Sequence, residues 1–149
     1  MKPMQLVIFT LDQEQFALRL DAVEGVVHAV GIGVLPKAPQ IVDGIVNVHG
    51  RVIPVVNVRR RFNLPERDVA LTDKFILAHT ARRPICLVVD TVTAIGEYPD
   101  QSIEEAGNVL PNLEYVAGIM RLPEGVVFIH DLDEFLSLEE EASLERALA

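Results

Sequence analysis

The side chains that could carry chemistry are few and lie far apart in this sequence. None of the four histidines, His28, His49, His79 and His130, has a histidine four residues away or a neighbouring cysteine. Zinc sites draw ligands from closely spaced pairs of this kind, so the spacing does not indicate a metal. We therefore expect ordinary strand histidines and neither a metal nor another cofactor.

The sequence gives no better support for nucleophilic or acid-base catalysis. Cys86 lies in the apolar run ICLVV, which predicts a buried, reduced thiol. Asp131 and Asp133 could act as a carboxylate pair, but their place at a predicted helix start is typical of capping residues. No base is placed to activate any of the three serines, Ser102, Ser137 and Ser143. The pattern favours a binding module and predicts no enzyme.

A hairpin is the best-marked element that could position a binding surface. Residues 46–48 and 51–58 are rich in β-branched side chains, and His49-Gly50 between them provides a glycine where a two-residue turn needs positive φ. Pro54 cannot donate a ladder hydrogen bond, which predicts a sheet edge or a bulge there. The arginines at 59–61 follow, and their residue types favour a solvated basic turn over a partner-binding patch.

The chain also contains an internal duplication. Residues 6–27 match 75–96 with apolar opposite apolar nearly throughout, and residues 41–62 match 115–136 in the same way. The matches include glycine and aspartate, which chance similarity between β-rich segments does not explain. Two units of about five short strands each are expected to close into small barrels, because closure removes exposed sheet edges.

Composition limits the class of protein further. The chain has 149 residues and a net charge of −9, with six basic and seventeen acidic groups in residues 62–149. Such a surface repels nucleic acid. A single cysteine predicts a cytoplasmic protein, and no apolar run reaches the roughly 18 residues needed for membrane insertion. Capping-box spacing at Asp131 with Glu134 and at Ser137 with Glu140 predicts a terminal helix over 132–149.

Together these segments resemble the CheW family of chemotaxis coupling domains. The resemblance covers about residues 5–138 and rests on FALRLDAVEGVV, IVDGIVNVHGRVIPVVNVRRRF, ICLVVDTVTAIGEYP, and YVAGIM followed by VVFIHDLDEFL. It implies an all-β fold of two tandem five-stranded SH3-like barrels with a groove between them, short helical turns and a C-terminal helix. Residues 1–149 would then form a single domain made of two intertwined β subdomains.

The resemblance also implies a function without catalysis. Members of the family are signalling adaptors that bridge chemoreceptors to the histidine kinase CheA. The expected partners are therefore the signalling tip of a methyl-accepting chemoreceptor and the regulatory domain of a CheA-type kinase. The alternative is a divergent CheW-like scaffold that binds a different protein partner.

The same resemblance assigns partner-binding positions to this chain: Val23, Gly25, Asn47, His49, Gly50, Val52 and Arg59. Two of these positions depart from the family pattern, which usually has Glu where this chain has Gly25 and Arg where it has His49. That pair is expected to form a salt bridge across neighbouring strands. Loss of both members together is physically coherent, because a buried charge left without its partner is strongly destabilising.

Overall fold

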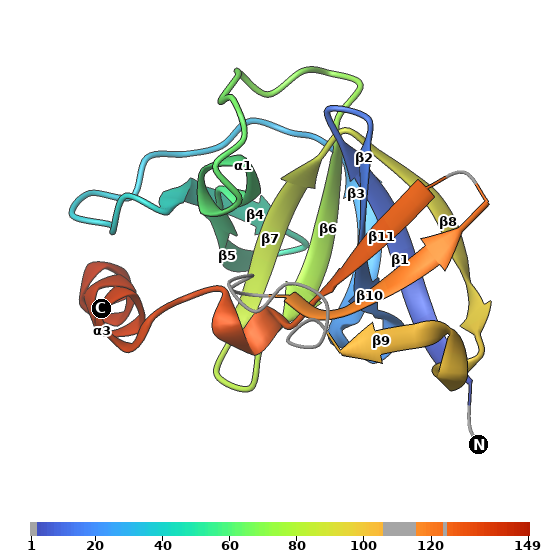
Figure 1. The fold of residues 1–149 in the computed structure, drawn as a ribbon. Coiled ribbons are helices and arrows are strands. Elements are labelled where there is room, and N and C mark those ends of the chain that lie inside the picture. The colour runs from blue at the N-terminus through green and yellow to red at the C-terminus, as the bar shows by residue number, and fades with distance from the viewer. Residues whose placement is uncertain (1–2, 106–115, 124) are drawn as a thin grey trace.

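The computed structural model describes residues 3–105, 116–123 and 125–149, which form two β-sheets lying side by side (Figure 1). Sheet A has the spatial strand order β8, β1, β2, β11, β10, β9, and sheet B has the order β3, β6, β7, β5, β4. The strands are β1 (Met4–Leu11), β2 (Glu14–Arg19), β3 (Val23–His28), β4 (Val42–Val48), β5 (Arg51–Val56), β6 (Lys74–His79), β7 (Pro84–Val89), β8 (Thr91–Tyr98), β9 (Ile103–Glu105), β10 (Val116–Leu122) and β11 (Gly125–His130).

The helical segments are short and mostly link strands. They are η1 (Leu20–Ala22), α1 (Val58–Arg61), η2 (Asp100–Ser102), η3 (Leu132–Glu134) and α3 (Leu138–Leu148), of which the η segments are 3₁₀ turns. The predicted all-β fold class with short helical turns and a C-terminal helix is confirmed. The terminal helix is shorter than predicted, because the helical conformation stops after η3. A separate helix, α3, then begins with a capping box between Ser137 and Glu140.

Two-residue turns close the hairpins β1–β2 and β4–β5. His49 and Gly50 have φ angles of 52° and 83°, and Asp12 and Gln13 have 51° and 71°. Positive φ at both central residues matches the right-handed twist of the flanking strands. The predicted His49-Gly50 turn is therefore confirmed, and the β1–β2 turn has the same backbone conformation.

Pro54 does not lie on an edge strand, because β5 has β7 on one side and β4 on the other. Ile45, its partner in β4, exchanges backbone hydrogen bonds with Gly33 instead, at 2.8 and 2.9 Å. The backbone nitrogen of Pro54, which has no hydrogen to donate, therefore faces β7. The strand β7 pairs with β5 at the next two residues, Val55 and Val56. The proline sits just before that parallel ladder and interrupts no hydrogen bond.

The predicted duplication is visible in the strand pairing. Leu6 lies opposite Arg19 in β1–β2, and Phe75 lies opposite Val88 in β6–β7, a shift of 69 residues along the chain. The hairpin β4–β5 recurs as β10–β11 after a shift of 74 residues, with a register irregularity at the same place in each. The two repeats therefore share both sequence pattern and backbone geometry.

Neither sheet is built from one contiguous half of the chain. Sheet A combines β1 and β2 of the first repeat with β8, β9, β10 and β11 of the second, whereas sheet B combines β3, β4 and β5 with β6 and β7. Four strand pairs make these exchanges: the parallel ladders β2 with β11 and β5 with β7, and the antiparallel ladders β1 with β8 and β3 with β6. Each repeat therefore supplies strands to both sheets.

Three apolar clusters follow from this arrangement. One lies inside sheet A around Ile8 and Met120, and another inside sheet B, where Phe75 and Cys86 pack with Val27 and Val48 from opposite ends of the sheet. The largest lies between the sheets and includes these buried side chains: Phe9, Phe16, Leu18, Val56, Leu87 and Phe135. Most of the space between the two sheets is thus filled core.

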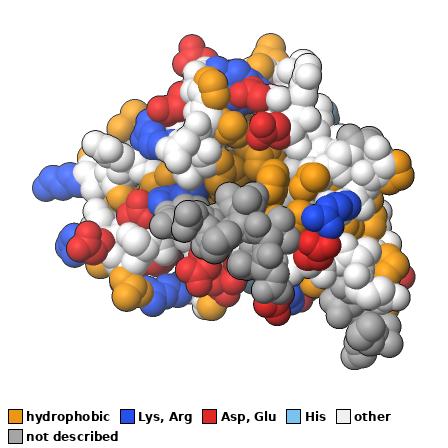
Figure 2. All heavy atoms as spheres, viewed as in Figure 1, with side chains coloured by type: hydrophobic (Ala, Val, Ile, Leu, Met, Phe, Trp, Pro, Cys, Tyr) orange, Lys and Arg blue, Asp and Glu red, His pale blue; other side chains and the backbone are white. Residues whose placement is uncertain are grey.

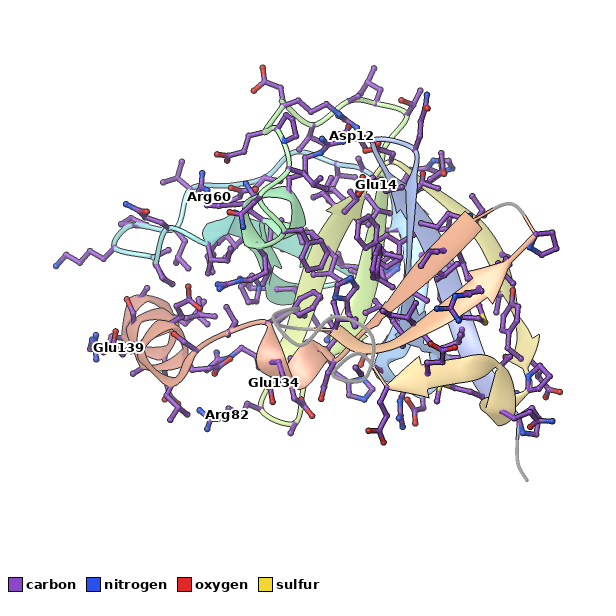
Figure 3. The ribbon with its side chains drawn as sticks, in the orientation of Figure 1. Asp12, Glu14, Arg60, Arg82, Glu134 and Glu139 are labelled. Carbon is purple, nitrogen blue, oxygen red and sulfur yellow. The ribbon has the colours of Figure 1, made fainter. Side chains whose placement is uncertain are left out.

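A network of charged side chains ties the β1–β2 turn to sheet B. Arg59 in α1 contacts Asp12 at 2.8 Å and Asp90 at 2.8 Å, and Asp90 is also 2.6 Å from Arg67. Arg67 in turn holds Asp73, which is only 2% exposed, at 2.7 Å. Asp12 is the first of the two residues of the β1–β2 turn (Figure 3). The connection of residues 63–73 supplies Arg67 and Asp73, two of the five charged residues of this network.

Burial and charge act in opposite directions on the carboxylates of the network. Burial alone would raise the pKa of Asp90, but the Asp12 N–H and the guanidinium groups of Arg59 and Arg67 hold that pKa below its ordinary value of 3.8. The pKa of Asp73 is likewise lowered, because Arg67 and the Ala70 N–H outweigh the effect of burial. Both groups are therefore bound in their charged form.

The network predicts a loss of stability in acid. A carboxyl whose folded pKa is depressed stabilises the protein above 3.8, its unfolded value, and that contribution disappears as the pH falls through the lower folded value. Asp73→Asn should lose about 1–3 kcal/mol near neutral pH and show a flatter decline below 3.8 than the wild type. Urea unfolding at several pH values measures both effects. Asp68→Asn is the control, and an Asp73→Asn profile parallel to the wild type would contradict the assignment.

A second prediction concerns Gly44. An added Cβ would collide with the carbonyl oxygen of Gly33 and approach the Ile32 side chain to 2.8 Å, at a φ of 155°. We expect Gly44→Val to lower the free energy of unfolding by about 2 kcal/mol or more. Gly31→Ala is the control, because an added Cβ there has no atom within 4 Å. A Gly44→Val variant with the wild-type urea midpoint would show that the backbones are not in close contact.

Candidate functional site

Six of the seven predicted binding residues lie around one end of sheet B. Val23 and Gly25 are on β3, Asn47 on β4, and the others in the β4–β5 turn or at the start of β5. An ion pair between Glu24 and Arg51, with 3.3 Å between Oε2 and Nη1, joins β3 to the start of β5. We call this region the turn surface: Val23, Glu24, Gly25, Asn47, His49, Gly50, Arg51 and Val52.

A β-bulge places Glu24 in this surface. Val23 pairs with Ala78 and Gly25 pairs with Leu77, so Glu24 is an extra residue without a partner on β6. Its side chain leaves the ladder and lies between Arg51 and His79, whose Nδ1 is 4.0 Å away. The bulge therefore creates an exposed ion pair from β3 to the start of β5 that the strand register alone would not create.

The turn itself is fixed from within. The Asn47 side-chain oxygen accepts a hydrogen bond of 3.0 Å from the Gly50 N–H. This bond holds the turn in the conformation that displays His49, which is exposed. Val52 follows on β5 with 54% of its surface exposed, although its neighbours Ile53 and Val55 are buried. The hairpin therefore presents one apolar side chain beside a pair of charges.

Gly25 and His49 form no ion pair, as expected from their side chains. A Cβ added at Gly25 would meet no atom within 4 Å, so the position is open. The charge pair present here, Glu24 with Arg51, lies one residue before Gly25 and two residues after His49. This region thus keeps one acidic and one basic group, at neighbouring positions.

Arg59 stands apart from the other six residues. It lies in α1, beyond the opposite end of β5, and is only 8% exposed. Burial acts to lower the pKa of its guanidinium, but the hydrogen bonds and charges of Asp90 and Asp12 raise it overall. Arg60 and Arg61 also form ion pairs, with Glu66 and Glu140. Arg59 and Arg61 are thus largely buried structural cations, whereas Arg60 is exposed, as the predicted solvated basic turn requires.

A cavity of about 350 Å³ opens at the junction of the two sheets. Its lining comes from the end of β2, η1, the end of β6, the start of β10, and the segment from β11 to η3: Arg19, Asp21, Ala22, His79, Ala117, His130, Asp131, Leu132 and Asp133. We call it the junction cavity. The described residues that line this cavity are mostly charged or polar. Figure 2 shows hydrophobic side chains gathered near the centre of one face, with acidic and basic side chains around them.

The described side chains offer little for catalysis. Burial raises the pKa of Cys86 to about 12, so its thiol stays protonated and unreactive at neutral pH. Asp131 accepts a hydrogen bond from the Asp133 N–H, which confirms its predicted role as a cap. Among residues 3–105, 116–123 and 125–149, no three acidic, histidine or cysteine side chains gather as metal ligands. None of the described helices is long and apolar enough to cross a membrane.

Glu24, Arg51 and His79 belong to the turn surface or border it, yet the sequence reasoning did not select them. Two of them are adjacent to predicted residues, and their opposite charges were a usable signal. The bulge that brings Glu24 to Arg51 depends on how β3 pairs with β6, which no local pattern reveals. Residues of the junction cavity were missed because four separate segments of the chain meet there.

Comparison with known proteins adds to this geometry. The chain is 23% identical over 142 residues to the chemotaxis protein CheW of Treponema pallidum, covering 91% of this chain and 84% of that protein. It is 25% identical to the chemotaxis protein CheW of Rhizobium meliloti, covering 91% and 89%. The crystal structure of the scaffolding protein TtCheW from Thermoanaerobacter tengcongensis superposes with a TM-score of 0.83 at 27% identity, covering 93% of this chain and 95% of that one.

The family assignment has the widest support. The sequence model of the CheW-like domain matches residues 5–140, which include both repeats, the turn surface and the junction cavity. The relatives are similar over nearly their whole length, so the likeness is not limited to one hairpin. The chain therefore belongs to the family of CheW-like domains.

Proposed function

We propose that this protein is a non-enzymatic chemosensory adaptor, which couples the signalling tip of a chemoreceptor to the regulatory domain of a CheA-type histidine kinase. The observation that carries the proposal is the match to the CheW-like domain over residues 5–140. The similar TtCheW structure is described as that of a scaffolding protein, which agrees with binding rather than catalysis. The buried, protonated Cys86 thiol is consistent with a non-enzymatic role.

The turn surface is the proposed contact site for one of these partners. Val52 is an exposed apolar side chain next to the Glu24–Arg51 ion pair, and an apolar centre with a charged rim is typical of protein interfaces. Asn47 and Gly50 act indirectly, because they hold the turn in shape. We place Arg59 outside this contact, as a residue that supports α1 and the β1–β2 turn.

A pull-down from purified components tests the proposal. The protein is mixed with the kinase regulatory domain and the receptor signalling tip from the same organism, separately and together. Binding to both is the expected result. Absence of binding to either would contradict the adaptor role and leave the alternative, a scaffold for a different protein partner.

The first prediction from this site concerns Val52. Val52→Glu should weaken binding to the partner that uses the turn surface by about ten-fold or more, because a charge replaces a buried apolar contact at the interface. The matched control is Val126→Glu, since Val126 occupies the corresponding position in the second repeat and is 44% exposed. Titration calorimetry measures the affinities. Equal losses for the two variants would show that the turn surface is not the contact.

The second prediction restores the charge pair expected from the family. Gly25→Glu combined with His49→Arg should strengthen binding by a few-fold, about the effect of one additional surface ion pair. The open space at Gly25 accommodates the new side chain. Each single substitution serves as a control for charge alone. Unchanged affinity in the double variant would argue that these positions do not face the partner.

A further inference from the structure

Helix α3 stands apart from the repeated strands, on the side of sheet B that faces away from sheet A (Figure 1). The match to the CheW-like domain ends at residue 140, within the first turn of this helix. Most of α3 therefore lies beyond the part of the chain that the family model covers, and neither sheet includes it.

Carboxylates make up much of the face that α3 turns towards the protein. Glu141 is only 6% exposed, and Leu144 is fully buried. The Arg61 guanidinium lies 2.7 Å from both carboxylate oxygens of Glu140, and the Arg83 guanidinium lies 3.0 Å from Glu141. The first arginine ends α1 and the second precedes β7, so two separate elements bind the helix. Two adjacent glutamates and a leucine three residues later thus make the contact.

Contacts of this kind hold a helix only weakly. The helix has eleven residues, and an isolated helix shorter than about 12–15 residues is marginal in water. The desolvation of a buried ion pair offsets much of its attraction, so the two arginine contacts add little net stability. Leu144 is the only apolar side chain of α3 that is buried, whereas Leu138 at its start is 73% exposed. We therefore expect α3 to detach and unfold locally while both sheets stay intact.

Detachment of α3 uncovers a surface of defined chemistry. The side chains of Arg61 and Arg83 are only 12% and 16% exposed while the helix is in place, and Leu144 belongs to the largest apolar cluster. Without the helix, both guanidinium groups lose a carboxylate and the place of Leu144 opens to solvent. We call this surface the helix socket: Arg61, Arg83 and the place in the apolar cluster that Leu144 occupies.

We propose that the helix socket is a docking site for an acidic amphipathic helix of a partner protein, and that α3 occupies this site until the partner displaces it. The bound α3 defines the chemistry of the occupant, which is two adjacent glutamates followed by a leucine on the same helical face. Anchors at this spacing are typical of helices that bind in grooves, and the planar guanidinium groups of Arg61 and Arg83 suit carboxylates. The proposal does not depend on the turn surface or on the junction cavity.

The test uses a peptide of residues 136–149 as the probe. It is titrated into the full-length, isotopically labelled protein, and amide shifts are followed by NMR. Because the tethered α3 competes with the peptide, Leu144→Ala in the protein should tighten peptide binding by about ten-fold or more. Leu138→Ala is the matched control, since that leucine is exposed and should leave the affinity unchanged. At saturation, the amides of the protein's own α3 should move to unfolded positions.

Variant peptides separate the socket from unspecific association. A peptide with Glu140→Gln and Glu141→Gln keeps nearly the same shape without the two charges, and we expect it to bind about ten-fold more weakly. A peptide with Glu139→Gln loses one charge on the exposed side of the helix and should bind as the unmodified peptide does. Hydrogen exchange of the β6 and β7 amides shows whether the protein variants keep sheet B.

Four results would overturn the inference. The first two are an absence of shifts at Arg61 and Arg83 in the Leu144→Ala protein, and equal affinity of that protein and the wild type. The third is equal binding of the peptide that lacks the two charges. The fourth is loss of protection over β6 and β7 in the Leu144→Ala protein, because α3 would then be part of the cooperative core and not a displaceable segment.

Discussion

Four strand ladders that join the two repeats determine most of the architecture: the parallel ladders β2 with β11 and β5 with β7, and the antiparallel ladders β1 with β8 and β3 with β6. Each ladder joins one repeat to the other, so the strands of a single repeat cannot complete a sheet by themselves. The largest apolar cluster lies between the sheets and includes Phe16 and Val56 from these ladder strands. The turn surface and the junction cavity both lie at the margins of this exchange. The turn surface is at the free end of sheet B, and the junction cavity is where η1 crosses from one sheet to the other.

Local chemistry made part of this fold predictable from the sequence. The His49-Gly50 turn depends on adjacent residues, and the duplication could be found because both repeats keep the same apolar pattern. The exchange of strands depends on contacts between distant segments, and the burial of Arg59 depends on Asp12 and Asp90, which lie far from it in the chain. The family resemblance pointed to residues on either side of Glu24 and Arg51. The bulge at Glu24 and the resulting ion pair could not be predicted, because they depend on how β3 pairs with β6.

The two repeats have the same backbone arrangement but carry different side chains at equivalent positions. Where one repeat has Arg59 and fills the space beside it with residues 63–73, the other has Asp133 and leaves the junction cavity open. The side chains at a few equivalent positions thus differ in charge, while the paired strands and their register stay constant.

The strand exchange has a consequence for how the chain can be divided. A single break in the connection of residues 63–73 separates the two repeats, but it cuts none of the strand pairs within the sheets. Each fragment taken alone would lack the partner of a parallel ladder and would expose half of the inter-sheet core. The repeats are therefore halves that fold through each other, and the chain suits reconstitution from two pieces, in which assembly of the pieces and folding are a single event.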